Sequence, residues 1–215
     1  MMLYHPTSGN AHTFPVRFRP RTCFVMTKLG KTAPPEVTAV RDDTRRILGS
    51  RAYEVTDASS RKTGKDILVK IWDQILAVPV GLAVVYAGIP SSTLANVFFE
   101  LGLMAALGKE TLVIRVGEAD IPSDFVRTEW LQYNEDFESG LNRFVDELYE
   151  RAEFFGIMAD SLDKDALLAI DYCRRAYLLT GAECYREQAR ALFCGSGLDK
   201  RPKDSVEVLL AAFCR

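Results

Sequence analysis

Apolar residues recur with two different periods between residues 23 and 133. Short runs rich in apolar residues are typical of buried strands, and they lie at residues 23–27, 51–56, 80–87, 110–116 and 129–133. Between them, apolar residues recur every three or four positions at about 36–48, 65–77 and 93–107, which is the spacing of amphipathic helices. The pattern predicts strands that alternate with helices.

This alternation predicts the fold class. Strand–helix–strand units are right-handed and build a parallel sheet with helices on both faces. We therefore expect a flavodoxin-like α/β domain with a five-stranded parallel sheet. Turn residues support the limits of the helices: Ser92 or Thr93 could cap the start of the third helix, while Gly49 and Gly108 could close the first and the third.

No strand pattern appears after residue 136. Amphipathic helical segments follow, with a turn at Gly181, and they lie at residues 137–155, 164–181, 182–195 and 204–214. We expect an N-terminal tail at 1–22, an α/β domain at 23–150 and an α-helical extension at 151–215. Because no long linker marks the boundary, we expect the extension to pack on the sheet domain or on a second copy.

Composition narrows the class of partner. The chain has 215 residues, 48% of them hydrophobic, and a formal net charge of −2, so neither nucleic acid nor an anionic membrane is expected as its main partner. The longest apolar run, at residues 75–90, is interrupted by Pro79 and Gly81 and is too short to span a bilayer. Arg17, Arg19 and Arg21 make the tail locally basic, and we expect it to be solvated.

The five cysteines argue against a metal site. They include no C-x-x-C pair and have no nearby histidine, so no zinc site is expected. Their odd number favours reduced thiols and a cytoplasmic location. We expect Cys173, Cys184 and Cys194 to be small core residues of the helical extension.

The sequence does not match several common catalytic and nucleotide-binding motifs. Gly30-Lys31-Thr32 would complete a phosphate-binding loop only if residue 25 were glycine, and it is Val25. No G-x-G-x-x-G follows a strand, and both histidines, His5 and His12, lie in the tail. A Ser-His or Cys-His relay within the domain is therefore excluded, so that carboxylates would have to carry any catalysis.

Glu100 is the carboxylate in the least expected setting. It lies in the segment NVFFELGLMAALGK, residues 96–109, which is apolar on nearly every side. Apolar neighbours would raise its proton affinity, and a carboxylate near a cleft could stabilise a developing cation or attack it. With Glu100 in the second turn of the helix, Asn96 would share its face. Alternatively, Glu100 forms a buried hydrogen bond or a salt bridge with Lys109 or Arg115.

These residues carry a resemblance to a family. GKDILVKIWDQI, then an apolar strand, then ANVFFELGLMAALGKETLVI is similar to the nucleotide-binding TIR-like proteins and the nucleoside 2-deoxyribosyltransferases. In that family D-I-x-x-K-I-W-x-x-I precedes a strand and N-P-N-V-x-Y-E-L-G-x-A-x-A-L-G-K follows it. The likeness covers roughly residues 23–134, and its densest part is residues 96–109.

The resemblance implies a site. The family's E-L-G glutamate, which acts on the ribose during glycosidic cleavage, falls on Glu100, and its asparagine falls on Asn96. The exit of the first strand, with Thr27 and Lys28, and the loop with Thr63 and Gly64 would line the base and phosphate side. NAD would be a substrate rather than a cofactor.

Two departures from the family lie beside this site. Relatives often carry an aspartate where the third strand ends, but this chain has Ala87-Gly88-Ile89, and Asn-Pro-Asn has become Leu94-Ala95-Asn96. Tyr86, Ser91 and Ser92 could replace the lost sugar contacts, although the serines could instead cap the helix. Asp57 could bind a ribose or be an ordinary turn residue, and Trp72 and Trp130 could stack on a base, although the position of Trp72 favours the core.

The resemblance implies cleavage of the N-glycosidic bond of NAD or a related nucleotide, with water as acceptor. Such domains serve as effectors of bacterial antiphage immunity and tend to work when assembled. The C-terminal helices would then bind a second copy or a partner protein. Two alternatives stay open: a non-catalytic nucleotide-sensing module that signals through these helices, and a nucleoside 2-deoxyribosyltransferase.

Overall fold

The computed structural model describes residues 6, 9, 16–28, 33–58, 67–122, 125, 130–162 and 165–195. The chain divides into two compact units. One comprises Arg21–Gly64 and Val78–Leu148, and we call it the sheet unit. The other comprises Met1–Pro20, Lys65–Ala77 and Tyr149–Arg215, and we call it the helical unit.

The sheet unit is built on a parallel five-stranded sheet, so the predicted fold class is confirmed. The strands are arranged in the order β2-β1-β3-β4-β5. Their bounds are Thr22–Met26 for β1, Glu54–Asp57 for β2, Val80–Tyr86 for β3, Glu110–Val116 for β4 and Trp130–Gln132 for β5. Every residue of β1 and β3 is buried, as expected for central strands that are covered on both faces.

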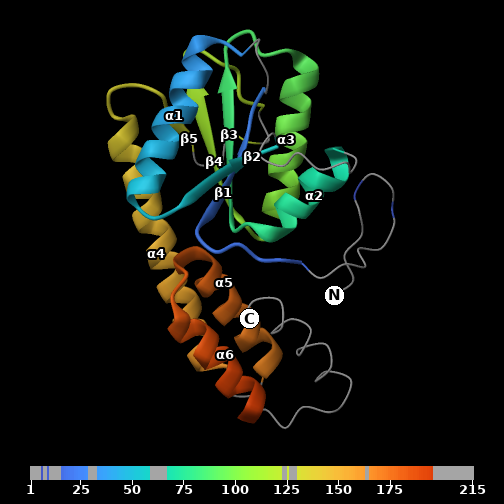
Figure 1. The fold of residues 1–215 in the computed structure, drawn as a ribbon, viewed down its shortest axis with the longest axis vertical. Coiled ribbons are helices and arrows are strands. Elements are labelled where there is room, and N and C mark those ends of the chain that lie inside the picture. The colour runs from blue at the N-terminus through green and yellow to red at the C-terminus, as the bar shows by residue number, and fades with distance from the viewer. Residues whose placement is uncertain are drawn as a thin grey trace. The chain divides into compact units, whose positions relative to one another are not determined.

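Helices cover both faces of the sheet (Figure 1). Helix α1 (Pro35–Ser50) and the first part of α4 (Phe137–Ser161) lie together, because Arg46 pairs with Glu138 at 2.8 Å and Arg51 with Asp146 at 2.5 Å. Helix α3 (Ser91–Ala106) lies on the opposite face and packs on β3 and β4. The unit is therefore a three-layer α/β/α arrangement.

The ends of the helices test the predicted caps. Gly108 does close α3: with φ of +68° it donates to the Ala105 carbonyl, and the next N–H reaches the Met104 carbonyl. The predicted cap at Gly49 is wrong, because α1 continues to Ser50 and is capped by Arg51. Ser92 and Thr93 are not N-caps either: α3 begins at Ser91, after Pro90, and no side chain caps it.

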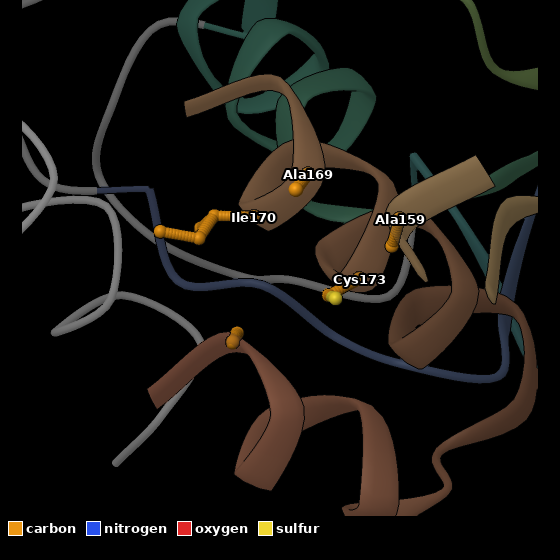
Figure 2. Packing of buried hydrophobic residues seen from close by; sticks show 5 residues of the cluster. Ala159, Ala169, Ile170 and Cys173 are labelled. Atoms are coloured by element: carbon orange, nitrogen blue, oxygen red, sulfur yellow. The ribbon is translucent and has the colours of Figure 1, made fainter. Parts of the chain in front are cut away.

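The helical unit contains α2 (Ile67–Ala77), residues 149–161 of α4, α5 (Ala166–Thr180) and α6 (Glu183–Gly195). Buried side chains from α4, α5 and α6 form its core (Figure 2). Partly buried hydrophobic residues, most of them aromatic, pack against this cluster. Gly181 ends α5 in the left-handed conformation, with φ of 66°, which confirms the predicted turn. The predicted helix at residues 204–214 lies outside the described residues.

Cysteine positions in the helical unit correct the sequence interpretation. Cys173 is buried in the core, as expected, but Cys184 and Cys194 are exposed on α6. Helix α6 contains cysteines, alanines and a tyrosine, which are only weakly apolar, so the sequence does not show clearly which of them face the core. The predicted burial of Cys184 and Cys194 was wrong for this reason.

The division between Leu148 and Tyr149 lies close to the predicted boundary near residue 150, inside the continuous helix α4. Two other segments differ from the predicted domains. The segment with α2 belongs to the helical unit. Residues 16–20 are more than a solvated tail: Phe18 packs on the helical core beneath Arg174, at 5.2 Å, and the Arg19 N–H donates to Ala77. The strand β1 then begins at Thr22.

Gly81 allows close packing under the central strand. A Cβ atom at this position would lie 2.5 Å from Sδ of Met104 and 3.0 Å from Cε of Met26. Both neighbours are flexible side chains, so they would have to move rather than the backbone. We expect Gly81→Ala to lower the free energy of unfolding by about 1–3 kcal/mol, measured by urea denaturation. Gly49→Ala, where a Cβ would meet nothing within 4 Å, is the matched control, and an equal loss in both variants would contradict this packing argument.

Candidate functional site

The carboxyl edge of the sheet brings most of the predicted site residues to one region. The chain leaves β1 toward β2 on one side, whereas β3, β4 and β5 extend the sheet on the other. The order therefore reverses between β1 and β3, and in open parallel sheets ligands bind beyond the carboxyl ends of the strands at such a point. Thr27 and Lys28 follow β1, Tyr86 ends β3, and Gly88 lies in the turn that follows.

Thr27 holds the two central strands together. Its hydroxyl donates to the Val84 carbonyl at 3.1 Å, and the residue is buried. The hydroxyl proton is thus used inside the sheet, and Lys28 is the first partly exposed residue after β1. Thr63 and Gly64, the other residues predicted for the base and phosphate side, lie outside the described residues.

Tyr86 and Gly88 shape the turn after β3. Tyr86 is 5% exposed, and burial raises the pKa of its phenol. Gly88 is exposed with φ of +80°, and a Cβ there would meet nothing within 4 Å. Glycine is therefore required by the backbone conformation rather than by lack of space. A sugar contact by the Tyr86 hydroxyl stays a prediction.

Helix α3 continues from this turn. Ser92 and Asn96 are exposed in its first two turns, and because the serines do not cap the helix, the reading of Ser91 and Ser92 as caps is wrong. The early start of α3 also changes the place of Glu100, which lies in the third turn rather than the second. At about 1.5 Å of rise per residue, Glu100 is about 13 Å along the axis from Ser91. A ligand that contacts both would have to be an extended molecule.

The Glu100 carboxylate is half-buried and, among the described residues, engages in no hydrogen bond or ion pair. Burial alone raises its pKa to about 7. The alternative of a salt bridge to Lys109 or Arg115 is wrong: the Lys109 amine donates to the Val78 carbonyl, while Arg115 pairs with Glu118 at 3.0 Å and donates to Ala119. The expected rise in proton affinity is thus found.

The position of Glu100 on α3 explains this environment. Val97, Phe98, Leu101 and Met104 form the buried face of the helix, and Glu100 lies beside this face rather than within it. Apolar neighbours exclude water from one side of the carboxylate without supplying a compensating cation. A carboxylate with a pKa near neutral pH can exchange a proton during a reaction or stabilise a developing positive charge when ionised.

Asp57 has the opposite environment. It is 1% exposed at the end of β2, and one of its oxygens accepts from Arg41 at 2.5 Å and from Arg45 at 2.9 Å. It therefore ties α1 to the sheet and is no ordinary turn aspartate, while a ribose contact by Asp57 stays a prediction. Arg41 and Arg45 were not predicted as partners of Asp57, although their spacing of four residues places them on one face of a helix.

The two tryptophans have separate environments. Trp72 is 5% exposed and belongs to the core, as its place on the helical stripe indicated. Trp130 is 43% exposed on the edge strand β5, and the Arg115 guanidinium lies 5.7 Å from the centre of its ring. A stacking role for Trp130 stays a prediction.

A comparison of the chain with known protein families finds no matching family, and a comparison with curated proteins finds no match. Within the described ranges, no cluster of histidine, cysteine, aspartate or glutamate could hold a metal ion. None of the described helices is both long enough and apolar enough to cross a membrane.

We expect Asp57→Asn to lower the free energy of unfolding by about 2–4 kcal/mol, because it leaves two guanidinium groups facing a neutral amide at a buried position. Urea denaturation at neutral pH measures the loss. Glu138→Gln, which breaks the exposed pair with Arg46, is the control and should have a much smaller effect. Equal losses in the two variants would show that Asp57 is not a structural anchor.

The raised pKa of Glu100 also predicts how stability depends on pH. The folded state retains the Glu100 proton up to about pH 7, whereas the unfolded state releases it near the ordinary value of 4.5. Stability is therefore lost as the pH rises between these values. We expect Glu100→Gln to be more stable than the parent by about 1–2 kcal/mol at pH 8 and as stable as the parent near pH 4. Urea denaturation of both proteins at the two pH values measures this difference. A constant difference would contradict the assigned pKa.

Proposed function

We propose that the chain cleaves the N-glycosidic bond of NAD or a related nucleotide, with Glu100 as the catalytic carboxylate. The observation that carries this proposal is a half-buried glutamate with its pKa raised to about 7 and no ionic partner among the described residues. It lies on the helix that follows the central strand β3 of a sheet with the order β2-β1-β3-β4-β5. The resemblance of residues 96–109 to the TIR-like and deoxyribosyltransferase motif supports the same assignment.

The reaction requires a negative charge beside the sugar. In NAD the bond between the ribose carbon and the pyridinium nitrogen breaks, nicotinamide leaves with the bonding electron pair, and positive charge develops on the ribose. Ionised Glu100 stabilises this charge, as carboxylates do in glycosidases. Water then adds to the ribose carbon and loses a proton, so that the products are ADP-ribose, nicotinamide and a proton.

The remaining predicted residues would position the substrate. Asn96 and Ser92 are exposed on α3 on the way from the turn to Glu100, and Tyr86 and Gly88 lie at the end of β3. Thr27 and Lys28 lie at the neighbouring exit of β1. Since Glu100 is about 13 Å along α3 from Ser91, an elongated dinucleotide fits this arrangement better than a single nucleoside.

The biological role follows from the resemblance alone. A TIR-like enzyme that removes NAD would act as an effector in bacterial antiphage immunity, in the cytoplasm. The C-terminal helices would then join a second copy or a partner protein that controls activity.

The test is chromatography of NAD incubated with concentrated protein. We expect the parent to release nicotinamide and Glu100→Gln to lose at least about 100-fold in rate, since a single electrostatic contact to the transition state contributes this much. Glu150→Gln, which changes an exposed glutamate of α4, is the matched control and should retain the parental rate. Equal release by the parent and Glu100→Gln would exclude the role of Glu100.

The pH dependence adds a second readout. Because the ionised form of Glu100 is the active one, the rate should rise with pH and reach half its maximum near pH 7. Release of bases from deoxynucleosides without release of nicotinamide would instead identify a deoxyribosyltransferase. Ligand binding by thermal shift without cleavage of either substrate would leave two readings: the nucleotide-sensing module, or an enzyme that awaits its activating partner.

A further inference from the structure

The helical unit exposes an apolar surface that runs from α4 to α5. Phe154 of α4 is 55% exposed and Leu168 of α5 is 42% exposed. Two half-buried rings connect them: the ring centre of Phe155 lies 6.2 Å from that of Phe154 and 5.7 Å from that of Tyr172. Tyr172 follows Leu168 by one helical turn and therefore lies on the same side of α5. We call these residues the α4–α5 surface.

The directions of the helices show where the chain leaves this unit. The Tyr185 hydroxyl of α6 donates to the Ala152 carbonyl of α4 at 3.4 Å, and the Gln188 amide donates to Asp160 at 2.6 Å. Residue numbers therefore rise in the same direction along α4 and α6, and α5, which a tight turn at Gly181 joins to α6, runs the other way (Figure 1). The chain thus leaves α6 at the end of the unit where α5 begins.

The part of the chain that follows α6 contains a segment that needs an apolar surface. Residues 204–214 have the spacing of an amphipathic helix. The apolar stripe of this segment comprises Val206, Leu209, Leu210 and Phe213. Helices shorter than about 12–15 residues are marginal in water unless an apolar face packs on something else. The segment is therefore expected to be helical only where its stripe is covered.

The α4–α5 surface lies within reach of this segment. Residues 196–203 connect the end of α6 to the segment and can span up to about 28 Å, whereas packed helices lie only about 8–10 Å apart. The connection is thus long enough to cross the first turn of α5, where Leu168 lies. A tether of this length also gives the segment an effective concentration of about 1 mM. A second copy or another protein would have to compete with that from solution, and this favours the chain's own segment as the occupant.

We propose that residues 204–214 form a helix that docks on the α4–α5 surface of the same chain. The helix runs in the direction of α5, from the level of Leu168 at its start toward the level of Arg151 at its end, over a length of about 16 Å. It completes a four-helix arrangement in which successive helices alternate in direction. The docking does not depend on the proposed glycosidase activity, because hydrogen exchange and cross-linking report on it directly.

The first experiment is amide hydrogen exchange of the full chain at two widely different protein concentrations. We expect residues 204–214 to exchange slowly and equally at both concentrations, and Leu168→Glu to speed their exchange by about 10-fold or more, because it places a charge under the stripe. The matched control is Leu167→Glu, which changes a leucine of α5 that is 43% exposed on the side away from Tyr172. This control should leave the exchange of the segment unchanged.

A second pair of variants changes the segment itself and leaves the core of α4, α5 and α6 intact. Leu210→Asp lies in the apolar stripe and should speed the exchange of the segment as Leu168→Glu does, whereas Val208→Asp lies on the opposite side and should not. Exchange in the parent as fast as in an unfolded peptide, or equal effects of Leu210→Asp and Val208→Asp, would overturn the proposal. Protection that appears only at the higher concentration would identify a second copy as the occupant and would overturn it too.

The second experiment tests the position and direction of the segment by disulfide formation with Cys214, after Cys184 and Cys194 are changed to serine. Arg151→Cys should cross-link to Cys214 within one chain when an oxidant is added, because the end of the segment lies at its level. Glu153→Cys, an exposed position about 160° away around α4, is the matched control and should not cross-link. A cross-link of Cys214 to Glu153→Cys alone, or dimers linked through Arg151→Cys, would contradict the proposed docking.

Discussion

The pairing of β1 with β3 is the constraint on which the rest of the sheet unit depends. These two strands are buried along their whole length, and the Thr27 hydroxyl adds a bond to Val84 beyond the ladder itself. Because a connection between parallel strands must cross a face of the sheet, placing β3 beside β1 forces β2 to one side and β4 and β5 to the other. The reversal point of the strand order therefore lies between these two strands, and α3 leaves the sheet from the end of β3 beside it.

Two carboxylates of the sheet unit, Asp57 and Glu100, have opposite surroundings: the first has cationic partners and the second has none among the described residues. Asp57 is the more enclosed, yet Arg41 and Arg45 supply two positive charges at hydrogen-bonding distance. Glu100 keeps some contact with solvent, but burial raises its pKa because no cation compensates. A carboxylate that stabilises a fold is found with cations, whereas one left alone beside an apolar face is typical of a functional site. This contrast supports a functional role for Glu100.

The sequence predicted which strands and helices form better than it predicted the residues at which they begin and end. Both central strands and β4 were located to within one residue, because runs such as VGLAVVY are apolar enough to be buried on both faces. The start of α3 was misplaced because Pro90 occupies the N-cap position, where a serine or threonine with a capping side chain was expected. This small shift moved Glu100 by one turn. The grouping of α2 with the C-terminal helices depends on contacts between distant residues, which periodicity does not report.

Helix α3 illustrates how one apolar segment can serve three different surfaces. The pattern around Glu100 suggested a helix apolar on nearly every side, and such helices are normally buried all round. Val97, Leu101 and Met104 lie on the buried face of the helix, and Glu100 lies at the edge of that face. Phe99, by contrast, is half exposed. Neither packing on the sheet nor glycosidic chemistry requires an uncharged outer face there. The half-exposed Phe99 follows from a helix that is covered on one side only, whereas the all-round apolar pattern had suggested burial on every side.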